Sequence, residues 1–333
     1  MQRREFLAGA MGAAVVGAAG LREGLAAGPA RRVGAIAEDA AKTHWPVQQR
    51  ELAPMDIGLI IRPADGAEAT IARVHELGMS NCFFSLDGYL GKFTPALARE
   101  LGGLLEKYNL VATAAEVVGP PPLVWDFLHG PSTIGLVPRA TRAARMDALK
   151  QTSDFAALLE IPRVQTHCGF IPEDPADPLY EEAVLAIREV AQHCAGNKQM
   201  FLMETGQETP TTMSRAIKDV DQANLGVGLD TANLILYGKA NPVDAVDIIG
   251  PHVRSIHAKD GRWPTDPMKL GEEVLIGTGL VDFEKVFTKL HRLGYTGAVT
   301  IERETSGPQQ IADVRAEKVY LEKILARVLA QQA

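Results

Sequence analysis

Residues 199–231 have a strand–helix–strand pattern. They read QMFLMET (199–205), GQET (206–209), PTTMSRAIKDVD (210–221), QAN (222–224) and LGVGLDT (225–231). The first and last of these runs are short and rich in apolar residues, and the long run between them is amphipathic. Strands that alternate with amphipathic helices indicate βα units and a parallel sheet.

The same alternation extends in both directions from this unit. Further strands are predicted at 56–62, 80–86, 109–117, 163–169, 253–259 and 297–303. Further helices are predicted near 66–78, 94–107, 140–160, 178–195, 242–249, 282–293 and 309–331. Eight strand–helix pairs in one series predict a single-domain (β/α)8 TIM barrel over residues 55–333. The alternative is an open doubly wound sheet, but the first strand-to-helix turn, Arg62 to Gly66, lacks that fold's glycine fingerprint.

The composition is that of an ordinary globular protein and excludes a disordered, collagen-like or low-complexity chain. The 333 residues are 46% hydrophobic and 23% charged, enough for a sizeable core without a disulfide framework. The net charge of −7 gives no general electrostatic attraction to nucleic acid, which is itself negatively charged. The three cysteines, Cys82, Cys168 and Cys194, lack zinc-site spacing and leave room for one disulfide at most.

The first 27 residues have the pattern of an export signal. Arg3 and Arg4 precede an Ala- and Gly-rich apolar stretch, and small residues follow around Ala27, as in a signal peptide. The paired arginines resemble a twin-arginine signal. The apolar stretch is shorter than the ~20 residues that span a bilayer, so we expect no stable membrane insertion. We expect residues 1–27 to be removed by cleavage and the mature protein to be periplasmic or otherwise exported. Residues 28–54 contain no convincing strand and are expected to be irregular.

Two long connections follow predicted strands. Residues 118–139 come after the third strand, and residues 260–281 come after the seventh. Both belong to the barrel face on which TIM-barrel enzymes carry their active sites. Each contains a tryptophan, Trp125 or Trp263. Connections of this length are uncommon unless they are functional or disordered.

Most of the predicted strands end in a polar or ionisable side chain. These side chains are Arg62, Ser85, Asp87, Glu116, His167, Glu204, Asp230, His257 and Glu302. The last four come from strands five to eight in order, and neighbouring strand ends of a barrel converge on one cavity. Three carboxylates would repel one another there unless a cation or protons neutralised them. An oxygen-rich set with one imidazole suits Mn²⁺, Mg²⁺ or Co²⁺, and Zn²⁺ remains an alternative.

Several short motifs carry a family resemblance. They are MET (203–205), GLDT (228–231), SIHAKD (255–260), GTGLVDF (277–283), GYTG (294–297) and IE (301–302). With these motifs the sequence resembles the xylose isomerase-like TIM barrel superfamily. Within it, the sequence is similar to the sugar phosphate isomerase/epimerase group that includes D-tagatose and D-psicose 3-epimerases. The resemblance covers about residues 56–330, is strongest over 199–304, and does not specify a substrate.

The resemblance implies a metal-dependent reaction. It implies that Glu204, Asp230, His257 and Glu302 bind a divalent metal, with Mn²⁺ as the first expectation. It further implies that Glu204 and Glu302 are the catalytic acid and base, one on each face of a sugar or keto-sugar. One glutamate would remove a proton next to the carbonyl and the other would return one, through an enediolate and without a redox cofactor.

The sequence departs from the epimerases at one substrate-binding position. The epimerases have a histidine three residues after the strand-six aspartate, where this chain has Asn233. An amide can hydrogen-bond a hydroxyl or carbonyl group but does not carry a proton readily. The epimerases also have an arginine shortly after the strand-seven histidine, and Arg262 is the candidate for it here.

Further substrate-binding candidates come from the strand ends and the long connections. His167 is expected to point toward the cavity, with a core histidine as the alternative. Glu116 can bind a sugar hydroxyl or cap the next loop. Lys259 lies on the same strand face as His257 and can hold an anionic or enolate oxygen. Trp125 and Trp263 can stack on a sugar or cover the mouth of the barrel.

Several functions are compatible with these residues. The same proton abstraction can expel a β-leaving group, as in an exported lyase acting on 3-keto-glycosides. A hydroxypyruvate isomerase-like enzyme would use the same four residues. A non-enzymatic sugar-binding protein would be expected to lack one of the paired glutamates, and both are present. A phosphodiesterase of the endonuclease IV type would need more histidines. A small-molecule sugar or keto-glycoside is therefore the expected partner, and the oligomeric state is left open.

Overall fold

The strands are short apolar runs that are buried along most of their length. The computed structural model describes residues 51–331. Its barrel strands are β1 (Ile57–Ile61), β2 (Asn81–Ser85), β3 (Val111–Glu116), β4 (Arg163–His167), β5 (Met200–Glu204), β6 (Leu225–Asp230), β7 (Val253–Ala258) and β10 (Val299–Ile301). They form a closed barrel in the order β1-β10-β7-β6-β5-β4-β3-β2. The predicted (β/α)8 barrel is therefore confirmed.

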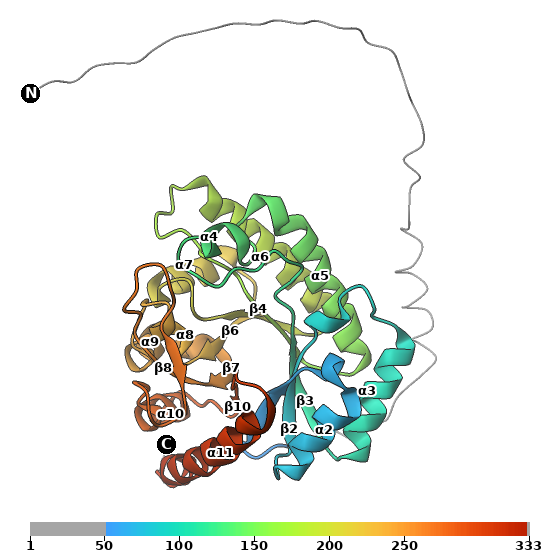
Figure 1. Ribbon diagram of the computed structural model, residues 1–333. Helices are drawn as coiled ribbons and strands as arrows, with labels where there is room; N and C mark the ends of the chain where they lie inside the picture. Colours follow the sequence, from blue (N-terminus) through green and yellow to red (C-terminus); the bar gives the residue numbers. More distant parts are fainter. Residues whose placement is uncertain (1–50, 332–333) are drawn as a thin grey trace, which may run out of the picture.

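The helices form a ring around the barrel (Figure 1). They are α2 (Ala67–Glu76), α3 (Pro95–Lys107), α5 (Arg139–Leu158), α6 (Pro178–Gly196), α7 (Pro210–Val220), α9 (Pro242–Ile249), α10 (Phe283–Arg292) and α11 (Gly307–Leu329). Several of them begin with proline after a capping side chain. Thr209, for example, accepts a hydrogen bond from the Thr212 N–H at the start of α7. These residues satisfy N–H groups that a helix start leaves free, which fixes where each helix begins.

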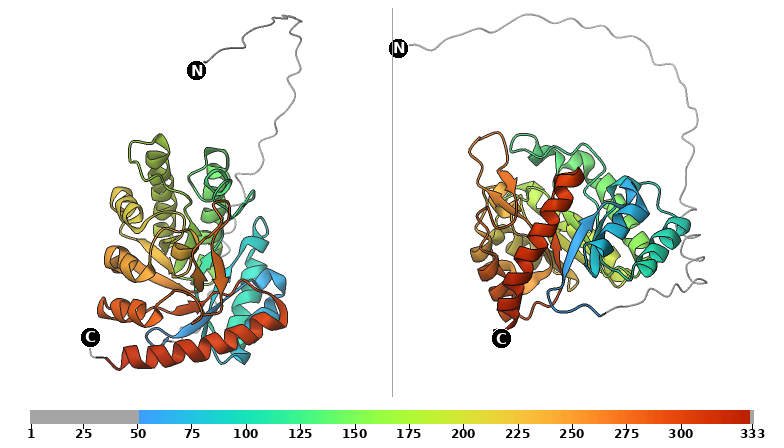
Figure 2. Two further views of the ribbon diagram at one scale, coloured as in Figure 1. Left: turned by 60° about the vertical axis from the view of Figure 1, so that its left-hand side comes forward. Right: turned by 60° about the horizontal axis from the view of Figure 1, so that its bottom comes forward.

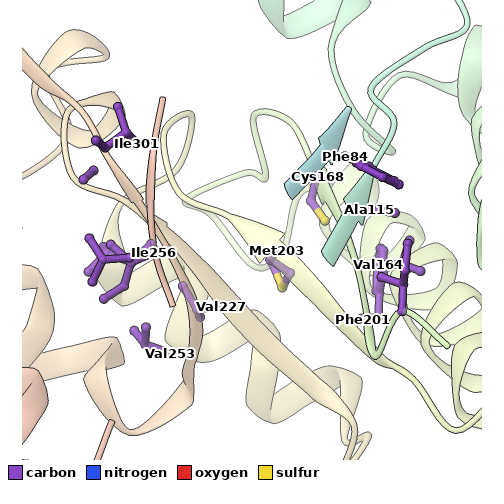
Figure 3. Packing of buried hydrophobic residues seen from close by; sticks show 14 of the residues in the cluster. Phe84, Ala115, Val164, Cys168, Phe201, Met203, Val227, Val253, Ile256 and Ile301 are labelled. Carbon is purple, nitrogen blue, oxygen red and sulfur yellow. The ribbon is translucent and has the colours of Figure 1, made fainter. Parts of the chain in front are cut away.

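The barrel closes where its first and last strands meet. Val299 of β10 is the register partner of Ile57 on one side and of Ile256 on the other. The last helix, α11, runs alongside β1 and covers this seam (Figure 2). Between strands and helices lies an apolar core that includes Val227, Ile256 and Ile301, all fully buried (Figure 3).

The two long connections contain a short helix and a hairpin that the sequence did not predict. The connection after β3 contains the short helix α4 (Gly130–Thr133). Arg145 of α5 is buried beside this connection and donates to the carbonyl oxygens of Pro122 and Gly135, at 2.7 and 2.9 Å. The connection after β7 contains a small antiparallel hairpin of β8 (Asp260–Arg262) and β9 (Glu272–Val274).

Some predictions fall outside this description. The signal peptide at 1–27 and residues 28–50 of the segment expected to be irregular lie outside the described residues. Within residues 51–331, no helix has the length and apolar character needed to cross a bilayer. The three cysteines are buried and free of disulfides.

Candidate active site

Four ionisable side chains meet at the carboxyl ends of the last four barrel strands. Glu204 ends β5, Asp230 ends β6, His257 lies near the end of β7, and Glu302 directly follows β10. All four are buried, with at most 9% of each residue exposed. Each offers one ligand atom, and these atoms lie within 4.8 Å of one another. The structure thus brings together the four residues that the sequence analysis singled out as ligands; we call them the strand-end cluster.

The imidazole of His257 lies between the two glutamates. Its Nδ1 is 3.2 Å from Glu204 Oε1 and 3.2 Å from Glu302 Oε2. Asp230 uses Oδ1 to accept from the N–H groups of Ala232 and Asn233, at 2.8 and 2.7 Å. Those two bonds hold the carboxylate so that its second oxygen is left for the cluster.

The strand-end cluster fits a divalent cation. Glu204 Oε2, Asp230 Oδ2 and Glu302 Oε2 are buried and accept no hydrogen bond within the described part of the chain. Buried carboxylate oxygens without donors are costly, and coordination of a cation is one of the few ways to satisfy them. Three oxygens and one imidazole nitrogen are donors that Mn²⁺, Mg²⁺, Co²⁺ and Zn²⁺ all accept.

The charged groups in and around the cluster shift one another's pKa values. Burial raises the pKa of Asp230 well above its usual value, and nearby Lys259 offsets only part of this. Burial also raises the pKa of Glu302, but Lys259 and His257 outweigh it, so its pKa is well below the usual value. For His257, burial lowers the pKa, but Glu204 and Glu302 outweigh it and raise the pKa well above the usual value. A cation that binds through this imidazole must therefore displace a proton, so its affinity falls as pH falls.

Three further candidates lie near the cluster: His167 contacts Glu204, Trp125 contacts His167, and Glu116 lies close to Glu204. His167 Nε2 is 3.4 Å from Glu204 Oε2, and the His167 ring meets the edge of the Trp125 ring with a centroid distance of 5.1 Å. Trp125 remains 42% exposed, so part of this residue is accessible next to His167. Glu116 is buried, and burial followed by repulsion from Glu204 raises its pKa well above the usual value.

A buried lysine faces the other side of the cluster. Lys259 Nζ lies 3.7 Å from Asp230 Oδ2 and 3.6 Å from Glu302 Oε2. It also donates to Asn233 Oδ1 at 3.5 Å and to Glu304 at 2.6 Å. The predicted pair Lys259 and Asn233 therefore lies at the site. Sequence reasoning did not assign Glu304 to it, since this residue lies after the end of the predicted strand 297–303.

Two of the predicted substrate-binding residues do not contact the cluster in the described structure. Arg262 lies on β8 and Trp263 follows it, and both side chains are exposed, Trp263 by 43%. The chain leaves the barrel at Lys259 and enters the β8–β9 hairpin, which separates these two residues from the end of β7. Their binding roles stay predictions.

Sequence reasoning missed two residues that touch His257. Gln165 of β4 places its amide nitrogen 3.4 Å from His257 Nε2. Phe83 of β2 presents a ring at 4.6 Å from the imidazole, in an edge-on arrangement. Gln165 could have been found from its position, because it is a glutamine inside a buried strand. It precedes His167 by two residues and therefore lies on the same strand face.

Comparison with known proteins agrees with this architecture. The family model described as xylose isomerase-like TIM barrel matches residues 71–324. The crystal structure of a xylose isomerase domain protein from Planctomyces limnophilus is 30% identical, with a TM-score of 0.79, and the match covers 84% of this chain and all of that one.

More distant matches are named enzymes. An inosose dehydratase of Bacillus anthracis is 25% identical over 194 residues, which are 54% of this chain and only 60% of the dehydratase. A D-psicose 3-epimerase structure determined in the presence of D-fructose shares the fold, with 18% identity, a TM-score of 0.62 and coverage of 81% and 99% of the two chains. By its family match and its closed barrel, the chain belongs to the xylose isomerase-like TIM barrel family.

Proposed function

We propose that the protein is a divalent-metal-dependent enzyme that moves a proton next to the carbonyl group of a sugar or keto-sugar. The observation that carries the proposal is the pair Glu204 and Glu302. Both carboxylates have an oxygen 3.2 Å from the same imidazole nitrogen, Oε1 in Glu204 and Oε2 in Glu302. Oε2 of each glutamate is buried and has no hydrogen-bond partner within the described residues. Two such carboxylates around one cavity can take a proton from one side of a substrate carbon and deliver one from the other.

The surrounding residues support this chemistry. A bound divalent ion, for which we propose Mn²⁺ first and Mg²⁺, Co²⁺ or Zn²⁺ as alternatives, would polarise the substrate carbonyl. Lys259 places a buried cation beside Glu302 and holds negative charge that develops on an enediolate oxygen. Asn233, which Lys259 contacts, and His167 would hydrogen-bond hydroxyl groups, and Trp125, which contacts His167, would stack on a sugar ring.

Elimination is a second candidate outcome of the same first step. It is favoured by the likeness to inosose dehydratase and by Asn233, an amide at the position where the epimerases have a histidine. After proton removal, the C–O bond on the next carbon would break and give an enone. The hydroxyl or alkoxy group would take up a proton and leave as water or an alcohol. The substrate would then be a cyclic keto-polyol or a 3-keto-glycoside.

Solvent deuterium exchange tests the step that both outcomes share. The protein, loaded with Mn²⁺, is incubated in D₂O with ketoses, inososes and 3-keto-glycosides, and loss of the proton next to the carbonyl is followed by mass spectrometry. We expect exchange with wild type and a loss of at least about 100-fold in Glu204→Gln and Glu302→Gln, as removal of an acid or base implies. Absorbance of an enone product would identify elimination. Deuterium exchange without enone absorbance would identify isomerisation or epimerisation.

The matched control is Glu284→Gln, an exposed carboxylate of α10 that pairs with Arg327 of α11. Metal content of wild type and variants is measured on the same samples. If wild type binds sugars but binds no divalent ion and exchanges no proton in the whole panel, the sugar-binding alternative replaces the enzyme.

We also propose that the protein is exported. The proposal rests on Arg3 and Arg4 followed by the apolar stretch. Cell fractionation should find wild type outside the cytoplasm and the Arg3→Lys, Arg4→Lys double variant retained inside. Equal distributions of the two would contradict a twin-arginine route.

A further inference from the structure

A buried amide lies behind the imidazole of His257. Gln165 of β4 has no exposed surface. Its Nε2 is 3.4 Å from His257 Nε2, and its Oε1 has no hydrogen-bond partner within the described residues. A fully buried amide with an unsatisfied oxygen beside a candidate metal ligand calls for an explanation.

The neighbouring strand leaves room for this amide. A Cβ at Gly228 of β6 would lie 2.1 Å from Gln165 Oε1 and 2.4 Å from its Cδ. Any side chain at position 228 would therefore displace the amide from His257. This accounts for the glycine that precedes Leu229 and Asp230, and it shows that two strands are shaped around the contact.

The geometry identifies which imidazole nitrogen faces the cation site. Nδ1 points between Glu204 and Glu302, at 3.2 Å from each, and Nε2 points to Gln165. A neutral imidazole that binds a cation through Nδ1 carries its proton on Nε2. That N–H is a donor and needs an acceptor, whereas an amide NH₂ group is a donor as well.

A half-turn of the amide gives the ring N–H of His257 an acceptor. The oxygen and nitrogen of a glutamine side chain are nearly equal in shape, so rotation by about 180° exchanges them without moving other atoms. The oxygen that has no partner then accepts the His257 Nε2–H. The opposite orientation donates to Nε2 when the proton lies on Nδ1 between the two glutamates.

We propose that Gln165 is a positioning residue that selects the metal-binding tautomer of His257. Its amide oxygen holds the ring proton on Nε2 and keeps Nδ1 free for a divalent ion. Phe83 limits the tilt of the ring through its edge-on contact at 4.6 Å. The inference rests on the metal site of the proposed function but concerns a residue outside the strand-end cluster.

The test compares two substitutions of Gln165 by titration calorimetry with MnCl₂. Gln165→Met keeps the length of the side chain and removes the acceptor, so we expect the Mn²⁺ Kd to weaken about 10- to 100-fold, as for other hydrogen-bond partners of metal-binding histidines. Gln165→Glu restores an acceptor oxygen, and we expect its Kd to lie within about threefold of wild type, well apart from the methionine variant.

Gln199→Met is the matched control. Gln199 is also a buried glutamine, and it bonds Ser153 and the Ile161 carbonyl, away from the cluster. Its loss should lower the melting temperature of the metal-free protein without changing the Mn²⁺ Kd. Metal-free melting of every variant, followed by circular dichroism, identifies any that fails to fold, and the glutamate variant then carries the comparison.

A spectroscopic measurement reports the tautomer itself. In the Zn²⁺-loaded protein, which is diamagnetic, long-range ¹H–¹⁵N correlation spectra should show the His257 proton on Nε2 in wild type. Gln165→Met should lose or shift that signal. An unchanged Kd and an unchanged spectrum in this variant would show that Gln165 only fills space. Failure of wild type itself to bind Mn²⁺ or Zn²⁺ would overturn the metal site and this inference together.

Discussion

Asp230 divides its two carboxylate oxygens between the backbone and the strand-end cluster. Oδ1 accepts from two backbone N–H groups, and Oδ2 lies 3.7 Å from Lys259 Nζ without a hydrogen bond. The backbone bonds fix the direction of the second oxygen, so the site is formed before any ligand arrives. At the scale of single residues, then, preorganisation comes from hydrogen bonds on the side facing away from the cavity.

Glu208 is one of the buried carboxylates outside the cluster. Only 1% of the residue is exposed, and neither carboxylate oxygen has a hydrogen-bond partner in the described structure. Burial raises the pKa of Glu208 to about 8, and nearby Lys239 offsets only part of this. The folded protein therefore keeps a proton on this group through neutral pH, whereas the unfolded chain releases it above its ordinary pKa of 4.5.

This difference predicts a pH dependence of stability. Since the folded pKa is the higher one, the contribution of Glu208 is fully present below about pH 4.5 and is lost as pH rises toward about 8. The unfolding free energy of Glu208→Gln minus that of wild type should therefore rise with pH, by at most about 1.4 kcal/mol per unit. Urea unfolding at several pH values in this window measures it. A difference that stays constant, as we expect for the exposed control Glu322→Gln, would contradict the burial of a protonated carboxyl.

At the scale of elements, one aspartate organises the β8–β9 hairpin and the segment after it. Both oxygens of Asp260 accept backbone hydrogen bonds, from Gly261, Gly277, Gly279 and Val281, at 2.9 to 3.0 Å. A Cβ at Gly279 would lie 2.2 Å from Asp260 Oδ1, so the close approach requires glycine there. The long connection after β7 is therefore anchored next to the site rather than free.

Asp260→Asn should loosen this connection. An amide replaces one acceptor oxygen with a donor that faces backbone N–H groups, and we expect a loss of about 2 kcal/mol in unfolding free energy. Amide hydrogen exchange should accelerate in the segment from Leu275 to Val281. Asp266→Asn is the control, because Asp266 lies in the same connection and bonds the Met268 N–H near the surface. Equal effects of the two substitutions would show that Asp260 is not the anchor.

At the scale of the whole molecule, the cluster joins strands that are far apart in the sequence. Its ligands come from β5, β6, β7 and the residue after β10, the strand that also pairs with β1 to close the barrel. A cation bound there would stabilise only the folded chain, since unfolding separates the ligands. Binding and stability are then linked by mass action.

Mn²⁺ should therefore raise the melting temperature. At a concentration about 100 times Kd, the expected gain is ~2.7 kcal/mol, or about 4–5 °C for a protein of this size. Scanning calorimetry should find this shift in wild type and in the surface variant Asp247→Asn, and none in Asp230→Asn. A shift of equal size in all three proteins would place the bound metal elsewhere.

Much of the fold could be predicted because it depends on local patterns. The eight strand predictions all overlap observed barrel strands, such as 225–231 with Leu225–Asp230. The residues of the cluster could be found because the ends of parallel strands necessarily meet. The hairpin of β8 and β9 was missed because its six strand residues include few apolar ones and give no period.

The barrel and the set Glu204, Asp230, His257 and Glu302 could be predicted because alternating patterns and strand ends are properties of neighbours in the chain. The contacts of His257 follow from the folded structure instead. Gln165 lies 92 residues from it in the sequence, and the space for its amide depends on Gly228 of another strand. The orientation of an imidazole is set by side chains that closure of the barrel brings together, and no local pattern carries that information.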